Sequence, residues 1–247
     1  MKPILEICCG SAEDGITAFA GGADRIELNC ALELGGLTPS LGSLLEIKSR
    51  VPQGKIMAMV RPRPGNFFYS EREYAAMKRD GELLLLSGAD GLVFGFLRED
   101  GSVDLERTAY MADLARRAGK EAVFHRAIDM VPHWKKGLDA LMEAGITRVL
   151  TSGQKPTAIE GAETLRQMQM YTAGRLEILP GCGVREHNLE ALLQYTGCQQ
   201  VHMSAHRQKE AGASFTEVSF GGYKQADKEL VLAAAKACRR CIQRRDG

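Results

Sequence analysis

Short, nearly continuous apolar runs recur along the chain, and they predict its strands. Eight such runs begin at intervals of about 21 to 36 residues and cover residues 4–8, 25–29, 55–60, 91–95, 121–125, 148–152, 176–180 and 200–205. Four of them follow similar openings, GADRIEL, GADGLVF, GITRVLT and GCQQVHM, in which glycine and a few mostly polar residues precede the run. Strands that are apolar at almost every position are typical of parallel sheets buried on both faces.

Polar residues between these runs mark where helices should begin. The candidate N-caps are Ser11, Ser40, Ser70, Asp104 and Thr157. Eight repeats of strand, loop and helix predict a single-domain (β/α)8 TIM-type barrel over residues 1–247, a length that suits this fold. The alternative is a doubly wound open sheet, which for nucleotide binding carries G-x-G-x-x-G after its first strand. Residues 9–14 read CGSAED, so that fingerprint is absent and no nucleotide cofactor is indicated.

The eighth unit departs from this regularity. An irregular segment, residues 206–223, precedes the final predicted helix over 225–242 and is long for a barrel loop. A lid, a subunit contact and a mobile loop are all compatible with it.

The charge and composition of the chain limit the kinds of partner that we expect it to bind. The chain has 32 Lys and Arg against 31 Asp and Glu, so no global field attracts nucleic acid or a membrane surface. No apolar stretch approaches a membrane span, and the N-terminal MKPILEICCG is too short and too interrupted for a signal peptide. We therefore expect a cytoplasmic protein, in which the seven cysteines are thiols.

Acids, bases and arginines gather at the predicted C-terminal ends of the strands, where TIM barrels place their chemistry. Glu27 and His125 are the candidate general base or acid, and Asp129 is expected to orient the histidine. Arg61 is expected to anchor a substrate anion. The full set of candidate substrate-binding residues is Glu6, Arg61, Arg63, Arg126, Thr151, Ser152, Gly181, Gly183 and His202. A purely structural alternative is that Glu6 and Glu27 pair with Arg61 in a buried ion network.

The cysteines suggest one metal ligand. Alternation along the first strand points Cys8 inward with Glu6 and turns Cys9 away, so the two cannot readily hold one ion together. Soft Cu(I) requires converging thiolate or thioether ligands, for which Cys8 and Cys182 are candidates. The barrel methionines are more typical of core filling. Cys238 and Cys241 form a lone C-x-x-C on the last helix and are expected to be surface thiols.

Taken together, these motifs resemble the CutC family, named for a proposed role in copper homeostasis. The matching pieces, which span residues 4 to about 205, are LEICCGS, GGADRIEL, LGGLTPSLG, RPR with FYS, GADGLVFG, DGSVD, FHRAIDM, RVLTSGQ, PGCGV and VHMSA. The resemblance implies a TIM-type barrel, a cytoplasmic location, a homodimer or larger homo-oligomer, and a disputed Cu(I)-binding function.

The family's proposed copper cysteines correspond to Cys8 and to the position of Asn29, so half of the pair is missing here. Cys30 does not simply replace it, because alternation points it away from Cys8. Two functions follow. The first is copper homeostasis, with Cys8 and either Cys30 or Cys182 holding Cu(I). The alternative is an enzyme with lyase, isomerase or hydrolase chemistry on a small polar, phosphorylated or sugar-like substrate.

Overall fold

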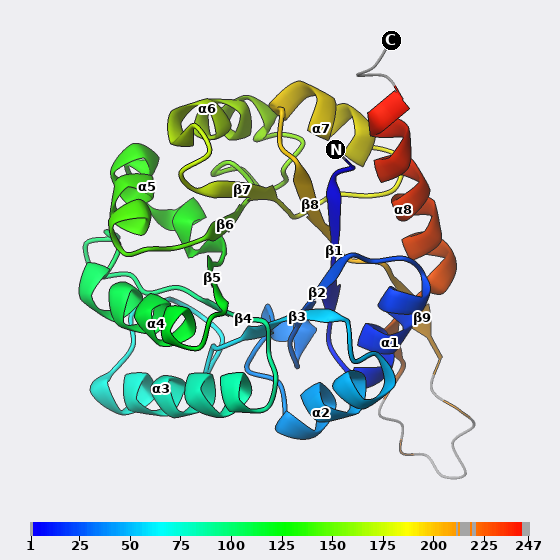
Figure 1. The fold of residues 1–247 in the computed structure, drawn as a ribbon, viewed down its shortest axis with the longest axis horizontal. Coiled ribbons are helices and arrows are strands. Elements are labelled where there is room, and N and C mark those ends of the chain that lie inside the picture. The colour runs from blue at the N-terminus through cyan, green and yellow to red at the C-terminus, as the bar shows by residue number, and fades with distance from the viewer. Residues whose placement is uncertain (1, 211, 213–217, 219–220, 244–247) are drawn as a thin grey trace.

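The computed structural model describes residues 2–210, 212, 218 and 221–243, and these form a barrel of parallel strands surrounded by helices (Figure 1). The barrel strands are β1 (Ile4–Cys9), β2 (Arg25–Leu28), β3 (Lys55–Met59), β4 (Gly91–Phe94), β5 (Glu121–Phe124), β6 (Arg148–Thr151), β7 (Glu177–Pro180) and β8 (Gln200–Met203). All eight predicted runs therefore contain a strand, and the predicted TIM-type fold is confirmed.

The helices lie outside the strands and follow them in sequence. They are α1 (Ala12–Ala20), α2 (Leu41–Arg50), α3 (Glu71–Leu86), α4 (Leu105–Arg117), α5 (Trp134–Glu143), α6 (Ala162–Thr172), α7 (Leu189–Thr196) and α8 (Lys228–Gln243), with short 3-10 helices η1 (Leu32–Leu34) and η2 (Arg126–Met130). Ser11, Ser40, Ser70 and Asp104 each accept a hydrogen bond from a backbone N–H in the first turn, as predicted. The Thr157 prediction is wrong: this hydroxyl accepts from the Glu160 N–H in a separate turn, and Gly161 precedes α6.

The strand ladder runs from β8 through β1 and on in sequence to β7. Strand β1 pairs with both β2 and β8, which places Glu6 opposite Arg25 and His202, and Cys8 opposite Glu27. Strands β7 and β8 lie side by side at the remaining seam (Figure 1), where these two described strands form no ladder of their own. Because β8 pairs with β1, residues from the first and last barrel strands are immediate neighbours at the C-terminal end of the barrel.

Two kinds of layer fill the barrel interior. At the N-terminal end, buried Arg25 and Arg148 are bound to carboxylates and to the side chain of Gln200. Above them lies a small apolar cluster of Met57, Met59, Val93 and Val123, which supports the prediction that methionines fill the core. The larger apolar core lies between the strands and the helices. Paired charges and apolar side chains therefore fill the lower part of the barrel.

The segment before the last helix is partly regular. Strands β9 (His206–Lys209) and β10 (Tyr223–Ala226) pair as an antiparallel hairpin, and α8 begins at Lys228 rather than at residue 225. Residues 211, 213–217 and 219–220 of the predicted irregular segment lie outside the described residues.

The prediction of surface thiols on the last helix is wrong. Cys238 and Cys241 are buried, because α8 turns this face toward the barrel. None of the helices in the described part of the chain has the length and apolarity needed to cross a membrane.

Candidate functional site

Two adjoining cavities of about 350 and 150 Å³ open at the C-terminal end of the barrel, and we call them together the barrel mouth. Both are lined by Cys8, Glu27, Arg126, Leu150 and His202, together with Gly35. The smaller cavity also contacts Arg61 and His125, and the larger one contacts Gly183. The mouth therefore gathers residues from the first, second, third, fifth, sixth, seventh and eighth strand units.

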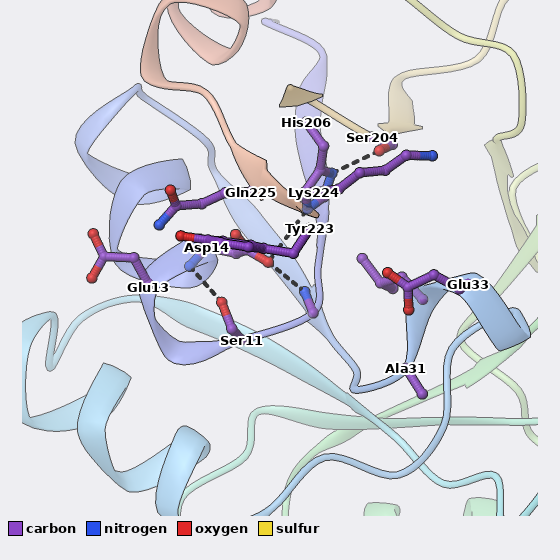
Figure 2. Close-up of a pocket in the computed structure, with 12 residues that line it drawn as sticks. Ser11, Glu13, Asp14, Ala31, Glu33, Ser204, His206, Tyr223, Lys224 and Gln225 are labelled. Atoms are coloured by element: carbon purple, nitrogen blue, oxygen red, sulfur yellow. Dashed lines mark hydrogen bonds and ion pairs between the residues drawn. The ribbon is translucent and has the colours of Figure 1, made fainter. Parts of the chain in front are cut away.

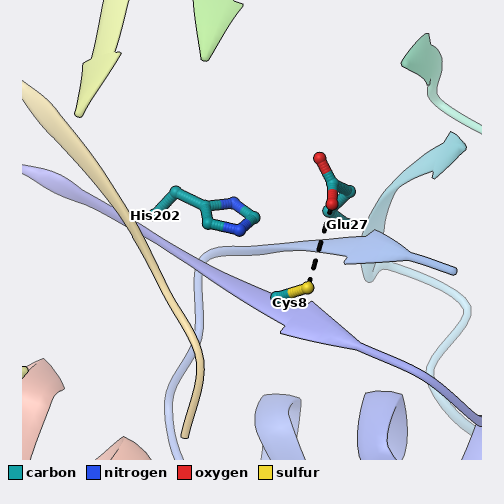
Figure 3. A group of neighbouring side chains, drawn as sticks. All are labelled: Cys8, Glu27 and His202. Atoms are coloured by element: carbon teal, nitrogen blue, oxygen red, sulfur yellow. Dashed lines mark hydrogen bonds between the residues drawn. The ribbon is translucent and has the colours of Figure 1, made fainter. Parts of the chain in front are cut away.

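Cys8, Glu27 and His202 form a close group of titratable side chains in the mouth (Figure 3). Each contributes one potential ligand atom, a thiol sulfur, a carboxylate oxygen and an imidazole nitrogen, and these atoms lie within 4.8 Å of one another. The Cys8 thiol is 3.9 Å from Glu27 Oε1. Neighbouring positions on β1, β2 and β8 create this group, which we call the Cys–Glu–His cluster.

Glu6 supports the cluster from below. Its carboxylate forms a buried ion pair with Arg25 and accepts a hydrogen bond of 2.8 Å from Nδ1 of His202. Burial alone would raise the pKa of Glu6, but Arg25 and His202 hold it well below the usual range. The expected Glu6–Arg61 pair is wrong, because Glu6 belongs to the N-terminal ion layer. Since Nδ1 of His202 is bound to Glu6, Nε2 is the ring nitrogen left for a ligand.

The pKa values of all three side chains in the Cys–Glu–His cluster are raised. Burial raises the pKa of Cys8 to about 11, and burial together with Glu6 raises the pKa of Glu27. Burial would lower the pKa of His202, but the carboxylates of Glu27 and Glu6 raise it well above its ordinary value. At neutral pH Cys8 is therefore a thiol and His202 an imidazolium ion. Any ligand that needs thiolate and neutral imidazole must displace both protons.

Asn29 stands where the resemblance places the second copper cysteine, and its side chain contacts both Glu27 and Cys8. Its amide nitrogen donates to Glu27 Oε1 at 3.0 Å and lies 3.6 Å from the sulfur of Cys8. Cys30 contacts the Thr38 carbonyl at 3.1 Å instead, as its alternation predicts. Cys182 lines the larger cavity, but its sulfur is bonded to the Pro156 carbonyl. Cys8 is thus the thiol that meets both Glu27 and His202.

Arg61 lies in the wall of the smaller cavity and is bound by backbone. Its Nη1 donates to the carbonyls of Gly35 and Gly36 at 3.0 and 3.1 Å, and Nη2 donates to Gly65. Both glycines have positive φ, and a Cβ at Gly35 would stand 2.9 Å from Nη1. The Gly35-Gly36 pair in the loop after β2 therefore allows the guanidinium to approach the chain closely.

His125 is neutral and does not act with Asp129 as predicted. Burial, followed by the charge of Arg61, lowers the pKa of His125 to about 3. Its Nδ1 accepts from the Ala127 N–H at 3.2 Å, and no hydrogen bond links its ring to Asp129 in the described structure. A cavity-facing base with so low a pKa is poorly matched to proton abstraction at neutral pH.

Asp129 instead holds Arg126 and the loop after β6. It accepts from Arg126 Nε at 2.9 Å, from the hydroxyls of Thr151 and Ser152, and from the N–H groups of Ser152 and Gln154. Arg126 also donates to the Ser152 hydroxyl at 2.9 Å. Thr151 and Ser152 are therefore placed to fix Arg126, and neither lines the two mouth cavities.

The other predicted binding residues differ in their positions. Arg63 pairs with Glu73 and donates to loop carbonyls outside the cavities. Gly181 packs under the mouth, where a Cβ would lie 2.5 Å from Leu150. Gly183 has a φ of 71° and lines the larger cavity.

Gly95 and Arg185 are among the contributors to the mouth that escaped the sequence reasoning. Gly95 leaves room for His125, because a Cβ there would lie 2.4 Å from the imidazole ring. Arg185 lines the larger cavity and donates to the Val184 carbonyl. Arg185 is part of the sequence PGCGVREHN, but nothing in this sequence indicates that its side chain lines the cavity.

A separate cavity of about 500 Å³ lies between α1, η1 and the hairpin (Figure 2). The Ser204 hydroxyl lies 2.7 Å from Nδ1 of His206, whose Nε2 lies 3.3 Å from Asp14. Asp14 also accepts from the N–H groups of Gly10 and Ala226. Burial opposes ionisation of Asp14, but these hydrogen bonds lower its pKa. Asp14 thus fastens both hairpin strands to α1.

Comparison with known proteins identifies clear relatives. The CutC family model matches residues 3–207. A family protein CutC from Treponema denticola is 50% identical over 211 residues, which cover 85% of each chain. The copper homeostasis protein cutC homolog of Homo sapiens is 41% identical over 87% of this chain and 78% of its own. A crystal structure of CutC from Streptococcus agalactiae superposes with a TM-score of 0.77 and 30% identity, covering 81% of this chain and 98% of that one.

Proposed function

Because this chain belongs to the CutC family, whose relatives include proteins named for copper homeostasis, we propose that it serves copper homeostasis by binding Cu(I) at the Cys–Glu–His cluster. The observation that carries the proposal is the convergence of the Cys8 sulfur, a Glu27 oxygen and a His202 ring nitrogen within 4.8 Å. Copper is then the cargo that the protein handles, rather than a resident cofactor.

The donor set suits Cu(I) through two of its three members. Thiolate and imidazole are ligands that copper accepts readily, whereas carboxylate is a harder donor that suits other ions better. Cys8 and His202 would therefore hold the ion. Glu27 lies beside both and accepts the hydrogen bond of the thiol, so it is placed to relay the thiol proton to solvent as the ion binds. Asn29 in place of the second family cysteine leaves one thiol at the site, so we expect a weaker site than a pair of thiolates would make.

The protons on the cluster predict how binding depends on pH. Because Cys8 and His202 each release a proton on binding the ion, apparent affinity should rise by up to about tenfold per pH unit for each proton. Glu6 should oppose loss of the His202 proton, yet it also fixes the ring with Nε2 available. The affinity for Cu(I) is therefore expected to be low in acid and to increase through neutrality.

A competition titration against a colorimetric Cu(I) chelator tests this assignment. Wild type should take up one Cu(I), and Cys8→Ser and His202→Gln should each weaken binding by at least about tenfold, the effect of losing one strong ligand contact. Cys30→Ser is the matched control, because its thiol contacts the Thr38 carbonyl outside the cluster. Equal binding by wild type and Cys8→Ser would reject the copper site. A parallel Zn²⁺ titration asks whether the mixed donor set prefers that ion.

A second candidate function is acid–base catalysis on a small polar substrate. It is favoured by Glu27, which is buried with a raised pKa directly above a cavity and beside His202. In this arrangement Glu27 keeps its predicted acid–base role, and His202 takes the place of His125 as its partner. A metabolite that raises the Tm of wild type but not of Glu27→Gln would identify a ligand of the mouth. Its conversion by wild type, and not by Glu27→Gln, would then support catalysis there.

Cytoplasmic location and self-association belong to the same proposal. All seven cysteines are free thiols, as a reducing compartment would keep them. Analytical ultracentrifugation over a range of protein concentrations would test whether the chain forms the homodimer or larger oligomer expected.

A further inference from the structure

The smaller mouth cavity, of about 150 Å³, has a wall that is unusually rich in hydrogen-bond donors. Arg61, His125 and Arg126 line it together with Phe67 and Met59. Glu27 is the one carboxylate in this wall, and burial raises its pKa. The cavity is therefore better supplied with positive charge and N–H groups than with groups that could neutralise them.

Arg61 carries a buried charge that no side chain compensates. The residue is only 7% exposed, and none of the described carboxylates lies within ion-pair distance of its guanidinium. Its Nη atoms donate to backbone carbonyls, but its Nε has no hydrogen-bond partner among the described residues. A buried guanidinium is ordinarily paired with an acid, since an unpaired buried charge is costly.

His125 supplies a second unused donor. Because its Nδ1 accepts the Ala127 N–H, the ring proton belongs on Nε2. The residue is only 4% exposed, and its Nε2 is buried without a hydrogen-bond partner in the described part of the chain. The imidazole ring packs on Phe67, with 4.7 Å between the ring centroids. Phe67 also packs against the Arg61 guanidinium at 5.1 Å, so one ring holds both groups in place.

Arg126 completes the set. Asp129 and Ser152 bind its Nε and Nη2, which fixes the guanidinium and leaves Nη1 without a partner among the described residues. An arginine held in this way meets an anion without first losing much side-chain freedom. Buried donors left unsatisfied on two different strand units indicate a missing acceptor.

We infer that the smaller cavity binds an oxyanion, the phosphate or carboxylate group of a small ligand, between Arg61, His125 and Arg126. The oxygen atoms of such a group accept from several donors at once, and charge-assisted hydrogen bonds to arginine are among the stronger ones. Cys8 and His202 line the same cavity, but the inference does not depend on copper, because the three donors that would bind the oxyanion are Arg61, His125 and Arg126.

Binding of inorganic phosphate and of acetate to the full chain tests this. We expect saturable shifts of the His125 Nε2–H signal in NMR spectra and a rise in Tm with phosphate or acetate, the stronger of the two identifying the oxyanion. Arg61→Gln and His125→Asn should each weaken binding at least about tenfold, as the loss of one charge-assisted or buried contact does. The asparagine side chain in His125→Asn keeps a hydrogen-bond acceptor near the Ala127 N–H, so we expect the loop to keep its fold in this variant.

Arg63→Gln is the matched control, since Arg63 lies two residues along the same loop but pairs with Glu73 outside the cavity. It should bind the anion like wild type. Absence of a saturable response to both anions in wild type, or an equal loss in Arg61→Gln and Arg63→Gln, would overturn the inference.

Discussion

Glu6 on the first strand and His202 on the last are joined by a 2.8 Å hydrogen bond across the β1–β8 ladder. The same carboxylate pairs with Arg25 on β2, so one acid links three neighbouring strands. Glu6 therefore connects the ion pairs at the N-terminal end of the barrel to the Cys–Glu–His cluster above them. The lower structural layer and the candidate site are therefore one connected network.

This link predicts that Glu6→Gln strongly destabilises the protein. The change would leave the buried Arg25 without its acid, and breaking one partner of a buried pair typically costs about 3–5 kcal/mol. Urea unfolding followed by circular dichroism would measure the loss. Glu33→Gln, at an exposed acid, should change stability by less than about 0.5 kcal/mol. Similar small effects for both variants would show that the network contributes little.

Cys8 should react slowly with alkylating reagents at neutral pH. Its pKa of about 11, against an ordinary 9.0, leaves about a hundredfold less thiolate than a free cysteine has. Site-resolved mass spectrometry after iodoacetamide treatment should show a rate that keeps increasing up to about pH 11. The same residue in urea-unfolded protein serves as the reference. A rate that levels off near pH 8 would contradict the proposed burial of the thiol.

His125 should make the folded state less stable as the pH falls. Its folded pKa of about 3 lies below the ordinary value of about 6.5, so between these values the unfolded chain binds a proton that the folded chain does not. Its contribution is complete above pH 6.5 and declines in acid by up to about 1.4 kcal/mol per pH unit.

The measurement is the difference in unfolding free energy between wild type and His125→Asn from pH 7 to pH 4. Because Asn does not titrate, wild type should lose stability relative to the variant as the pH falls. His202, whose pKa is raised, titrates in both proteins and cancels in the difference. A difference that does not change with pH would show that His125 is accessible to protons in the fold.

Gly36→Ala should damage the loop that holds Arg61. Gly36 has a φ of 82°, and a Cβ there would lie 2.5 Å from Asn29 Oδ1. Positive φ in a non-glycine residue costs on the order of 1 kcal/mol, and the clash adds to this. Gly119→Ala is the matched control, with a φ of 68° and open space around its Cβ. Thermal unfolding should show a larger loss for Gly36→Ala, and equal losses would mean that Asn29 moves aside freely.

The sequence by itself determined the barrel and several of the side chains at its mouth, among them Cys8, Glu27, Arg61 and His202. Eight apolar runs at regular spacing define the strands, because burial on both faces of a parallel sheet imposes that pattern. Alternation along short strands placed Cys8, Glu27 and His202 on the inner face, since successive side chains point to opposite sides. Four of the five predicted N-caps followed from local chemistry alone, because a cap depends on residues within one turn.

Only the tertiary structure decided which of these residues act together. Glu6 pairs with Arg25 rather than Arg61, and Asp129 holds Arg126 rather than His125, because strand register and loop conformation set these partners. Cys238 and Cys241 are buried because α8 turns that face to the barrel. Contacts between residues far apart in sequence depend on closure of the whole sheet, and no local pattern in the chain encodes them.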